Sequence, residues 1–122
     1  MSNLFQNVRT FHELIERCEN LEAIERFYAE NLIVQENNEE PRIGKDLCLE
    51  QERKNLARVS NLVQRILATA INEQTGVVMT QMQFDFTTTR GRRRLDEVVV
   101  QHWREGKIVH ERFYYKGFID MD

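Results

Sequence analysis

This sequence of 122 residues has few residues that interrupt helices and strands or form disulfides: one proline, five scattered glycines and two cysteines. No proline-rich or glycine-rich linker divides it, so we expect residues 1–122 to form a single domain. Long apolar runs are also missing. A membrane-spanning helix needs about 18 or more consecutive apolar residues, and no such stretch occurs in this sequence. The net charge of −3 gives no excess of positive charge for general nucleic-acid binding.

A signal for export is not recognisable either. The segment MSNLFQNVRTFHEL lacks the basic start and the continuous apolar run of a signal peptide. Cys18 and Cys48 fall within helical patterns and have no CxxC spacing. We therefore expect buried, reduced thiols in a cytoplasmic protein, with a disulfide as the alternative.

The first half of the chain has the apolar spacing of helices. Asn3 followed by Gln6, and Thr10 followed by Glu13, each fit a capping box at a helix start, and Asn20 is expected to cap a second helix. The apolar positions at helical spacing are Leu4, Val8, Phe11, Leu14, Ile15, Cys18, Leu21, Ile24, Phe27 and Tyr28. A short strand over 32–36 and a third helix after Gly44 are predicted to follow.

The second half changes to strand periodicity. Four β-rich runs between about Val59 and Tyr115 are separated by the turn segments NEQTG, TRGR and REGK. Helices followed by an antiparallel meander indicate an α+β domain. We expect a curved sheet with the helices packed over one face.

The turns predict which strand residues share a face. We interpret 104–106 as a three-residue hairpin loop and Arg90-Gly91 as a two-residue turn. The face covered by helices would then carry Thr80, Met82, Phe84, Phe86, Leu95, Val99, Trp103, Val109, Phe113 and Tyr115. The opposite face would carry Gln81, Gln83, Asp85, Val98, Val100, His102, Ile108, His110, Arg112 and Tyr114.

Three polar residues interrupt the apolar face: Glu97, Gln101 and Glu111. A carboxylate removed from water needs a partner, a proton or a wet cavity. Either these groups lie at the sheet's ends or pair with Arg58 or Arg65, or they line an apolar pocket with a few polar groups.

Two segments carry a resemblance to a known family. NLEAIERFYAENLIVQENNEEPRIG and the hairpin HWREGKIVHERFYY resemble the nuclear transport factor 2-like superfamily, which includes SnoaL-like polyketide cyclases, ketosteroid isomerases and limonene-epoxide hydrolases. The resemblance implies one SnoaL-like domain with a cystatin-like, cone-shaped fold. In it a bent antiparallel sheet wraps around N-terminal helices and leaves a ligand pocket. It also implies a homodimer through the outer sheet face.

The resemblance implies site residues as well. Glu36 matches the catalytic aspartate of ketosteroid isomerases and would act as a general base, and His12 matches their oxyanion-binding tyrosine. Val99 and Phe113 stand where relatives have catalytic aspartates. The substrate-binding residues would be Tyr28, Met82, Phe84, Glu97, Val99, Gln101, Trp103, Glu111, Phe113 and Tyr115.

Two classes of function follow from these predictions. One is a small-molecule enzyme, an isomerase, cyclase or hydratase that acts on an apolar molecule without a cofactor. The other is a non-catalytic module that binds a ligand or assembles as a dimer. A metal site is not expected, because His102 and His110 are predicted to face away from Glu111. The basic run Arg90–Arg94 is interpreted as a solvated turn.

Overall fold

The computed structural model describes residues 3–121. The helices are α1 (Leu4–Glu16), α2 (Asn20–Phe27) and α3 (Lys45–Ala57). The strands are β1 (Tyr28–Glu36), β2 (Arg42–Ile43), β3 (Ser60–Asn72), β4 (Val77–Thr88), β5 (Gly91–Arg104), β6 (Lys107–Tyr114) and β7 (Ile119–Asp120). No helix among the described residues is long and apolar enough to cross a membrane.

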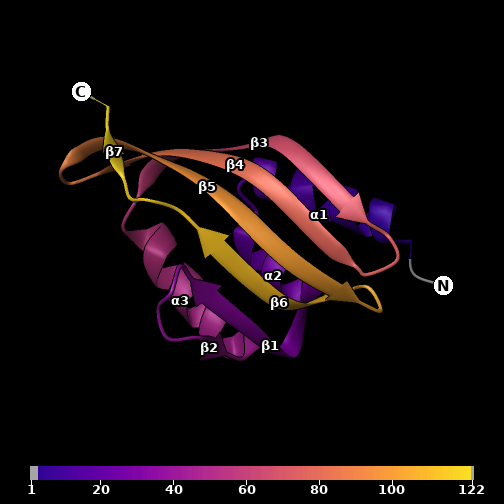
Figure 1. Ribbon diagram of the computed structural model, residues 1–122. Coiled ribbons are helices and arrows are strands. Elements are labelled where there is room, and N and C mark those ends of the chain that lie inside the picture. Colours follow the sequence, from indigo (N-terminus) through magenta and orange to yellow (C-terminus); the bar gives the residue numbers. More distant parts are fainter. Residues whose placement is uncertain (1–2, 122) are drawn as a thin grey trace.

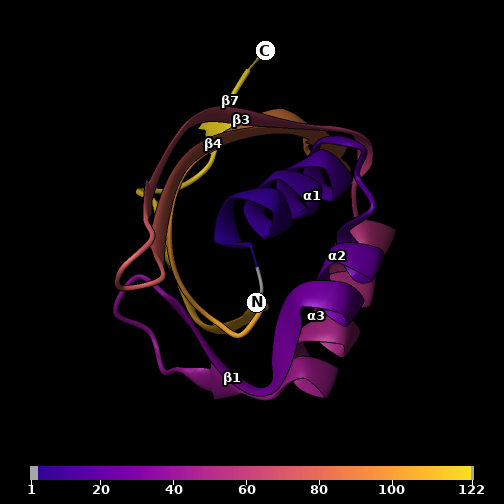
Figure 2. The same ribbon diagram turned by 90° about the vertical axis from the view of Figure 1, so that its right-hand side faces the viewer.

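The strands form one strongly curved sheet in the order β2-β1-β6-β5-β4-β3 (Figure 1). Strands β3 to β6 are the predicted antiparallel meander, whereas β1 runs parallel to β6 and β7 pairs with β5. The sheet arches around α1, and α2 and α3 stand along its open side (Figure 2). The predicted α+β class, with helices over one face of a bent sheet, is confirmed.

The helix starts agree with the sequence prediction at Asn3 and at Gly44, which precedes α3, but not at Thr10 or Asn20. The Asn3 side chain accepts a hydrogen bond from the Gln6 backbone N–H at 3.1 Å, so Asn3 is the N-cap of α1. Thr10, in contrast, lies inside α1, where its hydroxyl donates to the Gln6 carbonyl. The N-cap of α2 is Glu19, and Asn20 already belongs to the helix. The Asn20 side chain is therefore free for contacts across the domain.

The first hairpin of the meander has a different turn from the one predicted. Thr88 pairs with Gly91, so the turn residues are Thr89-Arg90 rather than Arg90-Gly91. Val99 consequently lies opposite Thr80 instead of Met82. This shift of two residues is a full period of a strand, so every side chain keeps its predicted face.

The second hairpin corrects one face assignment. Its turn has two residues, Glu105 and Gly106, with φ of 52° and 79°, as a type I′ turn requires. An irregularity in the pairing of β5 with β6 follows, between His102 and Trp103. Ile108, predicted to face outward, is fully buried, because the pairing partner of Trp103 is Ile108 and not Lys107. Beyond this bulge the predicted faces return.

Aromatic residues of α1, α2 and β5 pack against one another in the core. Phe11 of α1 meets Phe27 and Trp103 edge-on, with ring centroids 5.8 and 5.9 Å apart, and Phe27 lies 5.6 Å from Trp103. Such edge-to-face pairs stabilise a core beyond the effect of burial alone. Trp103 is thus a packing residue between the helices and β5.

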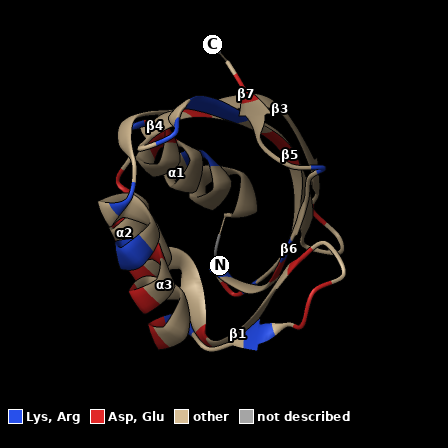
Figure 3. Ribbon diagram, turned by 90° about the vertical axis from the view of Figure 1, so that its left-hand side faces the viewer, with Lys and Arg blue, Asp and Glu red and all other residues tan. Residues whose placement is uncertain are grey.

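Charged residues of both signs occur along α2 and α3 and near the loop after β1, without a broad region of one sign in that view (Figure 3). On the outer sheet face Asp85 is buried between Arg94 and Arg65, at 2.7 and 2.8 Å. The hydrogen bonds from Arg94 and Arg65 hold the pKa of Asp85 well below its usual range. Arg65 therefore forms its ion pair on the outer face and does not pair with the carboxyl groups of the inner face.

Candidate functional site

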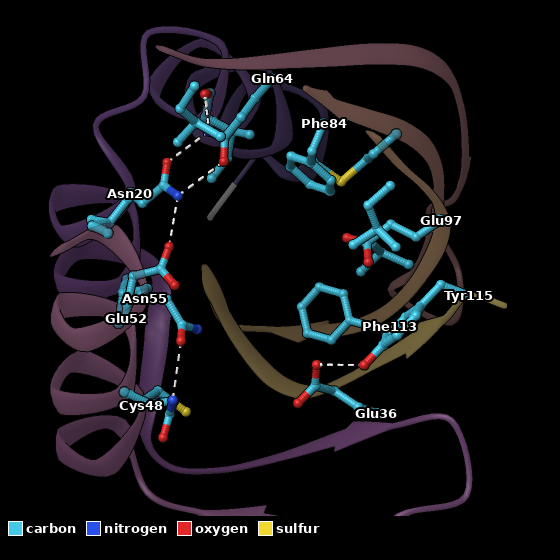
Figure 4. Close-up of a pocket in the computed structure, with 18 of the residues that line it drawn as sticks. Asn20, Glu36, Cys48, Glu52, Asn55, Gln64, Phe84, Glu97, Phe113 and Tyr115 are labelled. Atoms are coloured by element: carbon cyan, nitrogen blue, oxygen red, sulfur yellow. Dashed lines mark hydrogen bonds between the residues drawn. The ribbon is translucent and has the colours of Figure 1, made fainter. Parts of the chain in front are cut away.

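A cavity of about 570 Å³ lies between the concave face of the sheet and the helices. Its walls come from all three helices and from β1 to β6 (Figure 4). This volume is in the range of small-molecule sites, which are mainly apolar with a few polar groups. The polar residues that interrupt the apolar face, Glu97, Gln101 and Glu111, all line it. They lie neither at the sheet's ends nor against Arg65.

The predicted site residues line this cavity, with two exceptions. Those that do are Tyr28, Glu36, Met82, Phe84, Glu97, Val99, Gln101, Glu111, Phe113 and Tyr115. Trp103 is packed in the core as described above. His12 is half-buried on α1, and its Nε2 lies 3.4 Å from the Thr80 hydroxyl. Burial lowers the pKa of His12. His12 therefore does not border the cavity in which Glu36 lies.

Glu36 ends β1 at the rim of the cavity. Its carboxylate accepts a hydrogen bond from Arg42 at 2.7 Å and another from the Tyr115 hydroxyl at 2.9 Å (Figure 4). Burial and the hydrogen bond to Glu36 raise the pKa of Tyr115 to about 12. Since the side chain is one-third exposed (33%), Glu36 remains accessible to water and to a ligand.

Glu111 occupies the floor of the cavity and is fully hydrogen-bonded. The Tyr28 hydroxyl donates to Oε1, and Gln101 Nε2 donates to Oε2 at 2.5 Å. Gln101 Oε1 in turn accepts from Trp103 Nε1 at 3.0 Å. Burial raises the pKa of Glu111 to about 7, although the two hydrogen bonds act in the opposite direction. This network fixes the Glu111 carboxyl within the core.

Glu97 differs from the other carboxyl groups of the cavity because it has no partner. It lies on β5 opposite Met82 and is 7% exposed. No donor among residues 3–121 forms a hydrogen bond or ion pair with it. Burial raises the pKa of Glu97 to about 8, with further contributions from Glu111, Glu36 and Glu52. This pKa favours the protonated form of Glu97 at neutral pH.

Polar residues of α2, α3 and β3 that the sequence did not indicate as site residues also line the cavity. Asn20 Nδ2 donates to Glu52 at 2.6 Å, and the side-chain amides of Asn20 and Gln64 bond to each other in both directions (Figure 4). Cys48, buried and reduced, also lines the cavity. Gln64 lies opposite Phe84, an inner-face residue of the neighbouring strand β4. Assigning the faces of β3 from the sequence would therefore have indicated Gln64 as an inner-face residue.

A metal centre is not present among the side chains that the structure describes. No group of three or more histidine, cysteine, aspartate or glutamate residues in residues 3–121 could hold an ion. His102 and His110 form a cross-strand pair with ring centroids 5.4 Å apart. They lie on the outer face of the sheet, as predicted, and so away from the cavity.

The amino-acid sequence matches a known protein family over most of its length. Residues 8–111 match the family model described as a SnoaL-like domain. A search of curated protein sequences found no significant match.

Solved structures with the same fold differ in their described activities. A candidate SnoaL-like polyketide cyclase from Mesorhizobium loti has a TM-score of 0.80 at 24% identity, over 93% of this chain and 100% of that one. An LEH-like epoxide hydrolase from M. tuberculosis has a TM-score of 0.75 at 15% identity, over 93% and 78%. A candidate isomerase from Bacillus subtilis has a TM-score of 0.76 at 16% identity, over 94% and 90%. At these identities the likeness establishes the fold, and chemistry must be argued from the site.

Proposed function

The chain belongs to the SnoaL-like domain family, and on that premise we propose that it binds a small, largely apolar molecule in the cavity and transfers a proton on it without a cofactor. The observation that carries this proposal is the pair of carboxyl groups in contrasting environments. Glu36 is ion-paired with Arg42 at the rim, whereas Glu97 has no partner in the interior, where burial raises its pKa to about 8. Carboxyl groups held in different protonation states are the usual means by which one site supplies both a base and an acid.

In this proposal Glu36 accepts a proton from a carbon of the substrate or from an attacking water molecule. Glu97 gives its proton to a basic atom of the substrate, and the Tyr115 hydroxyl holds the Glu36 carboxylate in position. Isomerisation, cyclisation and hydration all need such a pair of proton transfers. The described activities of the relatives, a cyclase, an isomerase and an epoxide hydrolase, belong to this range.

Replacing Glu36 by glutamine should abolish turnover while leaving the fold and ligand binding in place. A screen by thermal shift with apolar carbonyl, phenolic and steroid-like compounds identifies binders, and turnover is then measured on those. For a binder that is turned over, we expect Glu36→Gln to lower kcat by about 10²- to 10⁴-fold, because a positioned base contributes about that much.

The matched control is Glu40→Gln, which neutralises an exposed carboxylate of the loop after β1. Turnover that is unchanged in Glu36→Gln would contradict the role of Glu36. If no compound of such a panel stabilised the protein, ligand binding in the cavity would be contradicted.

Assembly through the outer sheet face is a second proposed property, favoured by the apolar residues exposed there. Val63, Met79, Val98 and Tyr114 are each between 42% and 50% exposed. If two copies pair through this face, Val98→Glu should convert a dimer into a monomer, because it would bury a charge at the interface. Sedimentation velocity checks this, with Leu47→Glu on α3 as the control. A wild-type protein that stays monomeric at every concentration would refute the proposal.

A further inference from the structure

We propose that the cavity selects a ligand with an apolar body and a protonated nitrogen, and that Glu97 carries the negative charge that pairs with this nitrogen. The inference rests on the ligand site of the proposed function, since it names the class of molecule that would occupy the same cavity; for such a ligand Glu97 is the ion-pair partner in place of the proton donor. It goes further by assigning the charge of the ligand. Three properties of the site lead to it: an unpartnered carboxyl group, the sign of the surrounding charges, and the aromatic walls.

The unpartnered carboxyl group is that of Glu97. The residue is 7% exposed, lines the cavity, and forms no hydrogen bond or ion pair with residues 3–121. Glu36, Glu52 and Glu111 each have a donor: Arg42, Asn20 and Tyr28, respectively. A buried carboxylate without a partner is costly, and a cationic ligand would supply the missing partner.

The charges around Glu97 have mainly one sign. The carboxyl groups of the cavity are Glu36 on β1, Glu52 on α3, Glu97 on β5 and Glu111 on β6, and the guanidinium groups are Arg42, Arg58 and Arg93. Two of the guanidinium groups are engaged, Arg42 with Glu36 at 2.7 Å and Arg93 with Asp120 at 3.2 Å. Arg58 is exposed at the end of α3.

The side chains that act electrostatically on Glu97 are thus carboxyl groups, namely Glu111, Glu36 and Glu52. A positive group beside Glu97 would be stabilised by all of them. An oxyanion at the same place would be destabilised for the same reason. This field therefore favours a cationic ligand over an anionic one.

Aromatic rings surround the same space. Phe84 and Phe113 both extend into the open region that Glu97 borders (Figure 4). The face of an aromatic ring attracts a cation, and carboxylate and aromatic groups together are typical of sites for organic ammonium ions. The Met82 side chain, opposite Glu97, adds a flexible apolar surface for the body of the ligand.

Proton balance gives this inference a measurable signature. A strongly basic amine reaches the cavity as an ammonium ion, whereas Glu97 is protonated at neutral pH. Forming the ion pair therefore releases the Glu97 proton to solvent. The affinity should increase by up to about tenfold per pH unit until the pH reaches the pKa of free Glu97. Ionisation of Glu111, whose pKa is about 7, acts in the same direction. A neutral ketone, which accepts a hydrogen bond from the protonated carboxyl group, would show the opposite trend.

The experiment compares three probes with the same rigid body: adamantylamine, adamantanone and adamantane carboxylate. Isothermal titration calorimetry between pH 6 and 8, in buffers of different ionisation enthalpy, gives the dissociation constants and the protons released. We expect the amine to bind tightest, with a Kd that falls as pH rises and about one proton released below pH 7. In Glu97→Gln the amine should bind about 10- to 100-fold more weakly, and the release of the Glu97 proton should be lost, leaving only the smaller contribution of Glu111.

The matched control is Asp96→Asn, which removes the neighbouring carboxylate on the opposite face of β5 and should leave amine binding unchanged. Preference for the ketone, or for the carboxylate with loss of binding in Arg58→Gln, would overturn this inference and leave the cavity as a ligand site. Binding of none of the three probes would overturn the inference and the proposed ligand site together. An amine affinity equal in wild type and Glu97→Gln would overturn the role of Glu97.

Discussion

Glu97→Gln should raise the free energy of unfolding at pH 9 by roughly 2–4 kcal/mol, because glutamine keeps the volume of the side chain without a charge to bury. The pKa of Glu97 is about 8 in the folded protein, against an ordinary value of 4.5. Below the lower value the carboxyl group is neutral in both states and costs nothing. As the pH rises toward 8 the unfolded chain ionises first, so the wild type loses stability over this range.

Urea denaturation at pH 4 and pH 9 measures this effect. Glu97→Gln should match the wild type within error at pH 4 and exceed it at pH 9. Asp96→Asn, on the exposed face of the same strand, should show the pH dependence of the wild type. A pH dependence that survives in part in Glu97→Gln would belong to Glu111, whose pKa of about 7 gives the same sign over a narrower range. Equal gains for Glu97→Gln at both pH values would contradict the burial of an ionisable group.

Glu111→Ala should be the most damaging substitution in the cavity and lower the free energy of unfolding by roughly 3–5 kcal/mol. Glu111 is 2% exposed and accepts from Tyr28 and Gln101. Alanine would leave a void and two buried donors without an acceptor. Glu111→Gln fills the same space and keeps one acceptor oxygen, so its cost should be clearly smaller.

Chemical denaturation of both variants, together with Tyr28→Phe and the corresponding double variant, separates the void from the lost hydrogen bonds. A coupling free energy between positions 28 and 111 is expected, because the two side chains form one network. If Glu111→Ala were to unfold within about 1 kcal/mol of the wild type, the network would have no stabilising role.

The inner face of the sheet was predictable because strand side chains return to the same face every two residues. A register error of two residues therefore leaves each side chain on its correct face. The turn at 89–90 was placed one residue too late, yet Met82 and Val99 both face the helices, since the resulting shift of register was two residues. The charged residues Glu97 and Glu111 were recognisable as exceptions to an apolar pattern. Their contrasting hydrogen bonding was not recognisable, since it depends on which side chains meet in three dimensions.

Asn20 and Ile108 illustrate what the sequence leaves open. Asn20 was interpreted as a helix cap, because asparagine before an apolar run fits that pattern, but its amide reaches Glu52 and Gln64 instead. No local pattern joins residues so distant in the chain. Ile108 was misplaced because a bulge interrupts the alternation of β6, and nothing in the sequence marks that irregularity.

The parallel pairing of β1 with β6 has a consequence for the order of folding. The meander from β3 to β6 consists of hairpins, which close over short distances along the chain. The partners of β1, in contrast, come from the far end of the sequence, for example Glu111 beside Val34. Contacts so remote in sequence are slow to form, because a long loop must close first. We therefore expect the rim carboxylate Glu36 and the floor carboxyl Glu111 to come together late, and a ligand of the cavity to slow unfolding without accelerating folding.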